Sequence, residues 1–265
     1  MEQAQDSDFR LDGKVIVMTG AAGILGALAV ARFLDAGARV CALDVSTQAL
    51  ERLGADHDSL LKLAVDVIDK TSLRDAQQQL QERWGTADVL FNNAAAKSEN
   101  FFAPFEDFPL ADWNEVMGVN LTGAMLCCQV FGAPMAQRGR GAIVNTLSIY
   151  GIVAPDQRIY EGSEYLGRPI NTPAVYSASK AGLWGLTKYL ATYWGPRGVR
   201  VNAVTPGGVF SGQNQTFVHN YSQRVPLNRM ASGRDIVHAM SFLASDASSY
   251  VNGHNLVVDG GWTAW

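Results

Sequence analysis

The chain has 265 residues, of which 48% are hydrophobic and 17% charged, and its formal net charge is −4. That length is enough to bury the core of one large α/β domain. The mildly acidic balance gives no basic footprint for nucleic acid or for an anionic membrane, so we expect neither as a partner.

The cysteines and the N-terminus point to one compartment. Cys41, Cys127 and Cys128 lie in apolar stretches, which is typical of small buried side chains in a reducing environment. The N-terminal stretch MEQAQDSDFRLDG is acidic and lacks the apolar run of a secretory signal. No window of about 18 residues is free of charged or strongly polar side chains, so we expect no transmembrane helix. These features predict a soluble, cytoplasmic protein.

Short apolar runs alternate with longer amphipathic segments along the chain. Residues 14–19 are β-branched and are followed by Gly20, which predicts a buried strand, and 23–36 has helical spacing. Further strands are expected at 39–44, 60–66, 87–91, 142–147, 199–204 and 255–258. Further helices are expected at 48–53, 72–84, 111–137, 175–194 and 234–244.

Apolar strands separated by helices predict an α/β fold, a Rossmann-type doubly wound parallel sheet of about seven strands with helices on both faces. No linker or repeat interrupts the pattern, so residues 1–265 are expected to form one domain. The least regular stretches, 155–173 and 206–230, are long for loops of a compact domain. In such sheets ligands bind beyond the carboxyl ends of the strands, so we expect these stretches to be a substrate lid and a mobile substrate loop.

The segment TGAAGILG at 19–26 joins the first strand to the first helix. Its glycines permit a tight turn and a close backbone approach to a pyrophosphate, which the helix N-terminus would bind. Asp44 ends the second strand, where a carboxylate accepts hydrogen bonds from both ribose hydroxyls and repels a 2′-phosphate. These residues favour NAD over NADP, although a solvated strand end is the alternative reading of Asp44.

Tyr176 and Lys180 in the run YSASK are one helical turn apart and therefore share a face. A lysine charge favours the phenolate and so makes a tyrosine usable as an acid/base group. An exposed Tyr–Lys pair is the alternative for this motif alone. However, Ser148 and the segments 92–95 and 206–208 each follow a predicted strand, so they gather at one edge of a parallel sheet.

In this order the motifs resemble the short-chain dehydrogenase/reductase family, over about residues 10 to 262. The matching pieces are TGAAGILG, Asp44, Asp66–Val67, NNAA at 92–95, the segment around Asn120, Ser148, YSASK, Pro206–Gly207 with Ser211, and VDGG ending at Gly261. The resemblance implies that Tyr176 is the general acid/base, that Lys180 lowers its pKa and holds the nicotinamide ribose, and that Ser148 binds the reacting oxygen. It also implies that Asn120 holds a proton-relaying water.

The same resemblance implies a cofactor site and an assembly. The cofactor residues are Gly20, Gly23, Leu25, Gly26, Asp44, Asp66, Val67, Asn93, Ala94, Tyr176, Lys180, Pro206, Gly207, Val209 and Ser211. Family members form dimers or tetramers, so the resemblance implies a homo-oligomer, either a dimer or a homotetramer.

Three features depart from the family pattern. Ile24 stands where the family has a glycine, NNAA replaces NNAG, and Ser148 and Tyr176 are 28 positions apart, more than twice the family spacing. The third departure makes 155–173 an insertion over the active site. Its polar residues favour a hydroxylated or anionic substrate, with a charged surface loop as the alternative. The candidate substrate residues are Ser148, Arg158, Tyr160, Glu161 and Tyr176.

The histidines and cysteines show no metal-ligand spacing and there is no GxSxG elbow, so neither a metal site nor serine hydrolase chemistry is expected. The sequence predicts an NAD-dependent enzyme of carbohydrate metabolism that interconverts a secondary alcohol and a ketone, on a sugar or sugar-acid derivative. The IYEG run also resembles members associated with sugar and flagellin modification. Two alternatives stay open: a nucleotide-sugar epimerase or dehydratase with tightly bound NAD, and a non-catalytic dinucleotide-binding protein.

Overall fold

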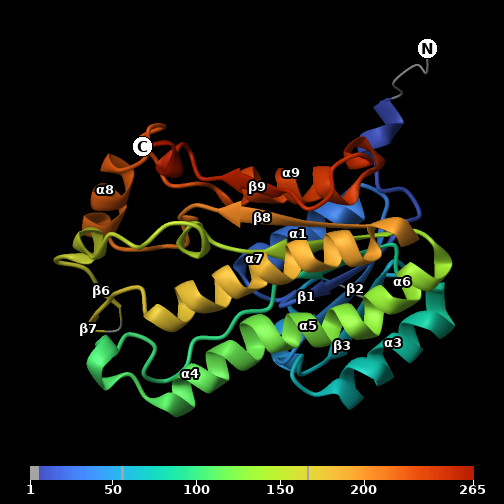
Figure 1. Cartoon of the computed structure of the whole chain (residues 1–265), viewed down its shortest axis with the longest axis horizontal. Helices are drawn as coiled ribbons and strands as arrows, with labels where there is room; N and C mark the ends of the chain where they lie inside the picture. The colour runs from blue at the N-terminus through green and yellow to red at the C-terminus, as the bar shows by residue number, and fades with distance from the viewer. Residues whose placement is uncertain (1–5, 55–56, 166) are drawn as a thin grey trace.

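A computed structural model of the chain describes residues 6–54, 57–165 and 167–265, and a parallel sheet forms its centre (Figure 1). The sheet has seven strands in the order β3-β2-β1-β4-β5-β8-β9, and every neighbouring pair is parallel. The strands are β1 (Val15–Thr19), β2 (Arg39–Asp44), β3 (Leu60–Ala64), β4 (Val89–Asn92), β5 (Gly141–Thr146), β8 (Val199–Pro206) and β9 (Asn255–Val258). The predicted Rossmann-type fold is confirmed, and the strand order reverses between β1 and β4.

Helices cover both faces of this sheet. They are α1 (Ile24–Asp35), α2 (Thr47–Glu51), α3 (Lys70–Trp84), α4 (Leu110–Met117), α5 (Ala124–Cys127), α6 (Ala133–Arg138), α7 (Ala174–Trp194), α8 (Gln215–Gln223) and α9 (Gly233–Ala244). In β1, Ile16 and Met18 pack in the core on the side of α1 and α9, whereas Val15 and Val17 pack in the core on the side of α3 and α7. Alternate residues of one strand thus serve two cores, which is why the strand is apolar throughout.

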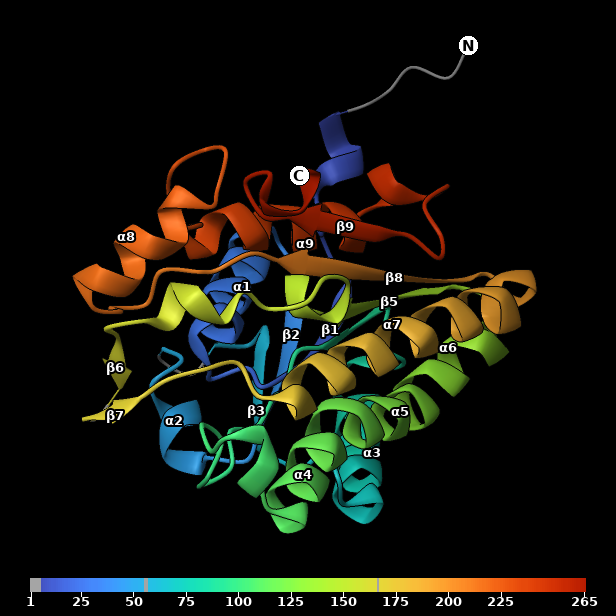
Figure 2. The same cartoon turned by 60° about the vertical axis from the view of Figure 1, so that its left-hand side comes forward.

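The run from α4 to α6 is one continuous helical segment rather than a regular α-helix. Wider π-type turns occupy Gly118–Gly123 and Cys128–Gly132. By length and composition alone Leu110–Arg138 could cross a membrane, which differs from the expectation that no such helix is present. Half of its most apolar window is buried inside the protein, and the run lies along α7 (Figure 2). A core helix of a globular protein has the same composition, and this run packs as one.

The two irregular stretches contain more structure than the sequence predicted. Residues 155–173 carry a short antiparallel pair, β6 (Glu164–Tyr165) and β7 (Arg168–Pro169), and 206–230 carries α8. β6, β7 and α8 lie together beyond the carboxyl ends of β8 and β9, at the left of the view (Figure 1). Both stretches therefore lie at the edge of the sheet where a ligand is expected.

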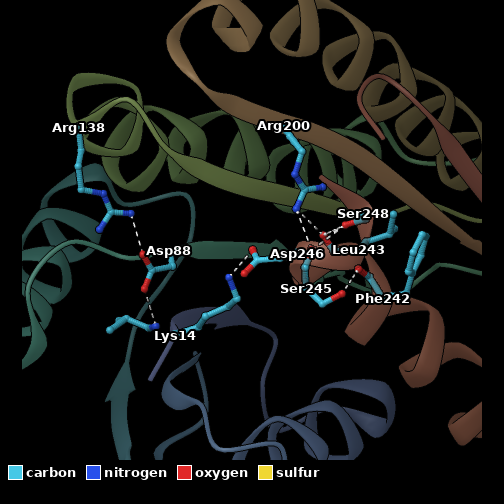
Figure 3. A network of polar contacts seen from close by, with 10 residues as sticks. Lys14, Asp88, Arg138, Arg200, Phe242, Leu243, Ser245, Asp246 and Ser248 are labelled. Atoms are coloured by element: carbon cyan, nitrogen blue, oxygen red, sulfur yellow. Dashed lines mark hydrogen bonds and ion pairs between the residues drawn. The ribbon is translucent and has the colours of Figure 1, made fainter. Parts of the chain in front are cut away.

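A network of ion pairs and hydrogen bonds lies at the opposite edge of the sheet (Figure 3). Asp88, before β4, accepts hydrogen bonds from the Val15 amide and from Arg138, both at 2.9 Å, and Lys14 pairs with Asp246 at 2.8 Å. A groove of about 760 Å³ at this edge is lined in part by these charges. Because they are paired with one another, we interpret them as a structural network that ties β1 and β4 to the helices behind them.

Candidate active site

The turn between β1 and α1 depends on Gly20 and Gly26. Gly20 has φ +61°, and a Cβ there would lie 2.8 Å from the Ala94 Cα, while a Cβ on Gly26 would lie 2.1 Å from the Gly20 carbonyl oxygen. Gly23 precedes α1 and offers no side-chain cap, so the first amides of the helix face no capping side chain. Glycines in this close turn and an uncapped helix N-terminus fit a pyrophosphate.

Ile24 replaces the glycine of the family pattern and is the first residue of α1. Its side chain is 60% exposed. Ile24 therefore places an apolar side chain on the surface. The close contact between the turn and the helix is made by Gly26 instead.

Asp44 ends β2 beside this turn, and its carboxylate has a structural function that the sequence did not reveal. Oδ2 accepts a hydrogen bond from the Ala22 amide at 3.0 Å, and Oδ1 accepts one from the Ser46 amide at 3.1 Å. Each oxygen has a second lone pair, so the carboxylate can hold the turn and still accept from a ribose hydroxyl.

The next two candidates, Asp66 and Val67, follow β3. Asp66 is exposed and accepts from the Ile68 amide at 3.1 Å. Val67 is buried against Gly123, where an added Cβ would lie 2.7 Å from the valine Cγ2. The side chain of Val67 is thus a core side chain, and its backbone is the part that an adenine ring could contact.

Thr19 joins the ends of β1 and β4. Its Oγ1 accepts hydrogen bonds from the amides of Asn93 (3.0 Å) and Ala94 (3.1 Å), and the Asn93 side chain donates to the Gly20 carbonyl at 3.2 Å. The NNAA segment is thereby fixed against the glycine turn, as a segment along a cofactor must be. Sequence reasoning passed over Thr19, although it begins the TGAAGILG motif.

Lys180 is 3% exposed, and its ammonium donates to the Thr146 carbonyl at 2.8 Å. The nitrogen lies 5.8 Å from the centre of the Tyr176 ring. Burial lowers the pKa of Lys180 to about 8. Burial also raises the pKa of Tyr176 above its usual value, and a hydrogen bond with Ser148 opposes that rise. Burial is therefore the largest influence on both the Tyr176 phenol and the Lys180 ammonium.

Asn120 lies in the first π-type turn and is buried. Its Oδ1 accepts from the Ala96 amide at 3.0 Å, and its Nδ2 donates to Ser179 Oγ at 3.1 Å; that hydroxyl in turn donates to the Tyr176 carbonyl at 2.9 Å. The amide therefore links the 92–96 segment to the first turns of α7. Ser179, which completes this link, was not singled out from the sequence.

A cleft of about 540 Å³ opens at the carboxyl edge of the sheet. Ten of the candidate residues line it: Leu25, Asn93, Ser148, Tyr160, Tyr176, Lys180, Pro206, Gly207, Val209 and Ser211. Gly20, Gly23, Gly26, Asp44, Asp66, Val67, Ala94 and Asn120 lie in the adjoining turns or behind the cleft wall. The structure thus brings half of the predicted site residues together in one cleft.

Arg158 and Glu161, expected over the substrate, do not line this cleft. The Arg158 side chain is 76% exposed and pairs with Asp156 at 2.8 Å. Asp156 also pairs with Arg224 of the α8 C-terminus at 3.0 Å, which turns the charged side of the insertion outward. Glu161 instead lines a neighbouring cavity of about 1090 Å³ between the insertion and residues 103–113.

Aromatic side chains that the sequence reasoning missed form much of the cleft wall. They are Phe101, Phe102, Tyr150, Phe217 and Tyr221. Tyr160 of the insertion stacks on Phe217 of α8 at 5.4 Å between ring centres. One signal was available: Asn214 caps α8 by accepting from the Phe217 amide, and Phe217 and Tyr221 have helical spacing.

The described residues hold no group of three or more His, Cys, Asp and Glu side chains that could bind a metal ion. The polar groups of the cleft are instead hydroxyls, amides and lysines. Such a site can hold a dinucleotide and move a proton at the oxygen of a small alcohol.

Comparison with known proteins agrees with this geometry. The family model described as enoyl-(acyl carrier protein) reductase matches residues 20–263. D-threitol dehydrogenase from Mycolicibacterium smegmatis is 37% identical, with 99% of each chain covered. Meso-2,3-butanediol dehydrogenase from Serratia marcescens is 32% identical, with 96% of each chain covered. A short-chain dehydrogenase structure from Leptospira borgpetersenii with bound NAD⁺ is 35% identical and has a TM-score of 0.86, with 99% of this chain and 97% of that chain covered.

Proposed function

Because this chain belongs to the short-chain dehydrogenase/reductase family of oxidoreductases, we propose that it is an NAD-dependent dehydrogenase that interconverts a secondary alcohol of a small polyol and the corresponding ketone. The observation that carries the proposal is the meeting of Ser148, Tyr176 and Lys180 in one cleft beside the glycine turn. The names of the threitol and butanediol dehydrogenases favour a polyol over the sugar or sugar-acid derivative that the sequence predicted.

The residues divide into a cofactor half and a reacting half. Gly20, Gly23 and the α1 N-terminus would hold the pyrophosphate, Asp44 the adenosine ribose, and Lys180 the nicotinamide ribose, and bound NAD would supply the hydride acceptor. Ser148 holds the reacting oxygen by a hydrogen bond. In alcohol oxidation the Tyr176 phenolate takes the proton of the substrate hydroxyl, and in ketone reduction the phenol returns it to the carbonyl oxygen. Burial raises the pKa of Tyr176 and so favours the phenol, whereas the positive charge of Lys180 favours the phenolate that oxidation needs.

The preference for NAD rests on charge. A 2′-phosphate beside Asp44 would bring two anions together, and residues 20–26 carry no basic side chain to offset the repulsion. The hydrogen bonds that Asp44 accepts from the Ala22 amide of the turn and from the Ser46 amide fix the carboxylate at that place.

Compartment and assembly complete the proposal. The three cysteines are buried and free, and burial raises the pKa of Cys41 and of Cys128 to about 12, so these thiols stay protonated and inert. Buried free thiols support a cytoplasmic location. The family resemblance supports a dimer or tetramer.

The experiment is a screen for NADH formation from polyols, sugars and sugar acids, with NAD and NADP in parallel and with Tyr176→Phe as the control. We expect turnover of a polyol with NAD and a loss of about a thousandfold or more in the variant, the usual scale of general acid/base catalysis. Product formation without net NADH would support an epimerase or dehydratase instead. Binding of NAD without turnover of any substrate would support a non-catalytic role.

A further inference from the structure

Tyr150 places a second hydroxyl in the cleft, close in sequence to Ser148. It lies in the short turn Ile149–Gly151 after β5 and lines the cleft, and the residue is 8% exposed. Its hydroxyl oxygen is buried and has no hydrogen-bond partner among the described residues. Buried hydroxyls are seldom left unpaired, so an unpaired one in a ligand cleft indicates a bond made to the ligand.

The turn holds this hydroxyl in place. Ser148 Oγ accepts a hydrogen bond from the Tyr150 amide at 3.2 Å. Gly151 lies so close to α7 that an added Cβ would be 2.9 Å from the Lys180 carbonyl carbon. Ser148 and Tyr150 are therefore fixed relative to each other and to the helix that carries Tyr176, as two groups that bind one substrate must be.

The hydroxyls around Tyr150 already have partners. Tyr160 bonds to Thr172 Oγ1, and Tyr221 accepts from the Gly208 amide. Burial and the nearby Tyr160, Tyr176 and Tyr221 raise the pKa of Tyr150, so its hydroxyl remains protonated and can donate. The Tyr160 hydroxyl is the neighbour that the Tyr150 hydroxyl faces without a ligand, but among these tyrosines Tyr150 is the one that lacks a fully formed hydrogen bond, so it can turn to a substrate group.

Asn171, at the end of the insertion, adds an acceptor to the same cleft. Its Nδ2 donates to the Phe102 carbonyl at 2.8 Å, which fixes the amide orientation. Its Oδ1 is buried and has no partner among the residues described. A carbonyl oxygen accepts hydrogen bonds and repels carboxylates, so this end of the cleft suits a neutral hydroxyl and disfavours a sugar acid.

We propose that Tyr150 and Asn171 form a second hydroxyl subsite, so that the substrate is a diol or larger polyol whose reacting hydroxyl lies at Ser148 and Tyr176 while a neighbouring hydroxyl binds at Tyr150. This inference rests on the proposed alcohol dehydrogenase activity and narrows its substrate class. A monohydric alcohol of the same carbon skeleton would leave both buried groups unpaired, which lowers kcat/KM for it.

The test compares Tyr150→Phe with the unchanged enzyme on meso-2,3-butanediol and on 2-butanol, which lacks the second hydroxyl. We expect the unchanged enzyme to prefer the diol, and the variant to lose about tenfold in kcat/KM for the diol, the scale of one hydrogen bond, and nothing measurable for 2-butanol. Tyr250→Phe is the matched control, because it removes an exposed tyrosine hydroxyl at the opposite edge of the sheet, and it should leave kcat/KM for both alcohols unchanged.

Two kinetic results would overturn the inference while leaving the dehydrogenase proposal intact. One is equal use of both alcohols by the unchanged enzyme, and the other is an equal loss for both in Tyr150→Phe. If neither alcohol is oxidised, the melting temperature with NAD and D-threitol decides. A threitol-dependent rise in the unchanged protein that disappears in Tyr150→Phe supports the subsite and leaves the activity to the wider polyol screen, whereas no rise, or equal rises, refutes the subsite.

Discussion

Lys180 couples the chemistry of the active site to the stability of the fold. Its ammonium is buried, donates to the Thr146 carbonyl at 2.8 Å, and has its pKa lowered by burial from 10.5 to about 8. A lysine whose pKa is lower in the folded chain than in the unfolded chain favours the unfolded chain at any pH where it is protonated. We therefore predict that Lys180 destabilises the fold at neutral pH.

The magnitude follows from the two pKa values. The shift from 10.5 to about 8 corresponds to about 3 kcal/mol of destabilisation well below the folded pKa. Between these values the unfolded chain binds more protons than the folded chain, so stability rises with pH. Integration from pH 7 to pH 9.5 gives a rise of about 2 kcal/mol in the free energy of unfolding from this one group.

The perturbation is Lys180→Met, which keeps an unbranched side chain and removes the titrating group. It also leaves the Thr146 carbonyl without its donor, a cost of about 1–3 kcal/mol that does not depend on pH. For this reason the pH dependence, rather than the stability at one pH, is the decisive quantity. Titrating groups that lie away from Lys180 are present in both chains, so their contributions cancel in the difference.

The assay is urea unfolding of both proteins at several pH values from 7 to 9.5, without added dinucleotide. We expect the free energy of unfolding of the unchanged protein, relative to Lys180→Met, to rise by about 2 kcal/mol over this range. Lys188→Met, which removes an exposed lysine of the same helix, controls for the loss of a lysine as such. Parallel curves for the unchanged protein and Lys180→Met would refute the burial argument.

Three further predictions concern the cofactor turn and the insertion. Asp44→Asn, which removes the charge and keeps one acceptor oxygen, should raise the NADP-to-NAD ratio of kcat/KM by about tenfold or more; an unchanged ratio in steady-state kinetics would assign Asp44 to the turn alone. Gly26→Ala places a Cβ 2.1 Å from the Gly20 carbonyl oxygen, so urea unfolding should show a loss of about 3 kcal/mol and calorimetry weaker NAD binding. The Arg158 and Arg224 side chains hold the pKa of Asp156 at about 2, below its usual 3.8, so its contribution to stability is complete above the usual value and is lost as pH falls toward 2. Asp156→Asn weakens the ion pair that joins the insertion to Arg224 after α8, so it should raise KM for the alcohol with little change in KM for NAD. Steady-state kinetics in which the variant and the unchanged enzyme have equal KM values for the alcohol would contradict this link.

The central sheet could be predicted from the sequence because its strands are buried on both faces. All residues of β1 are buried, and a short, continuous apolar run bounded by glycine has few other interpretations. Helix α8 could not be found by the same reasoning, since the run QTFVHNYSQ is mostly polar and only Phe217, Val218 and Tyr221 form its apolar face. Its cap at Asn214 was a valid signal, but one cap without a long apolar pattern is a weak one.

The candidate site also contains residues that could be predicted from the sequence and residues that could not. Residues at strand ends, such as Ser148 after β5, were predictable because parallel strands bring their carboxyl ends to one edge. The direction of a side chain in a loop was not predictable, because it depends on which partner the side chain finds. Arg158 bonds to Asp156 and so faces solvent, whereas Tyr160, two residues later, bonds to Thr172 and lines the cleft. Both residues belong to one polar stretch, so its composition could not show that the Arg158 side chain faces solvent and the Tyr160 side chain faces the cleft.

The part of the protein that we propose to hold the substrate has a hydrophobic core of its own. Side chains of the insertion, of α8 and of the C-terminal segment pack together, and Tyr221 stacks on Trp262 at 4.5 Å between ring centres. The cofactor turn belongs instead to the cores of the main sheet, through Ala21 and Ala29. Because the two halves meet along the turn that carries Ser148 and Tyr150, substitutions in the insertion or α8 can change which hydroxyls the cleft binds while the glycine turn and Asp44 stay as they are. Substrate preference and cofactor preference should therefore respond to separate sets of substitutions in this chain.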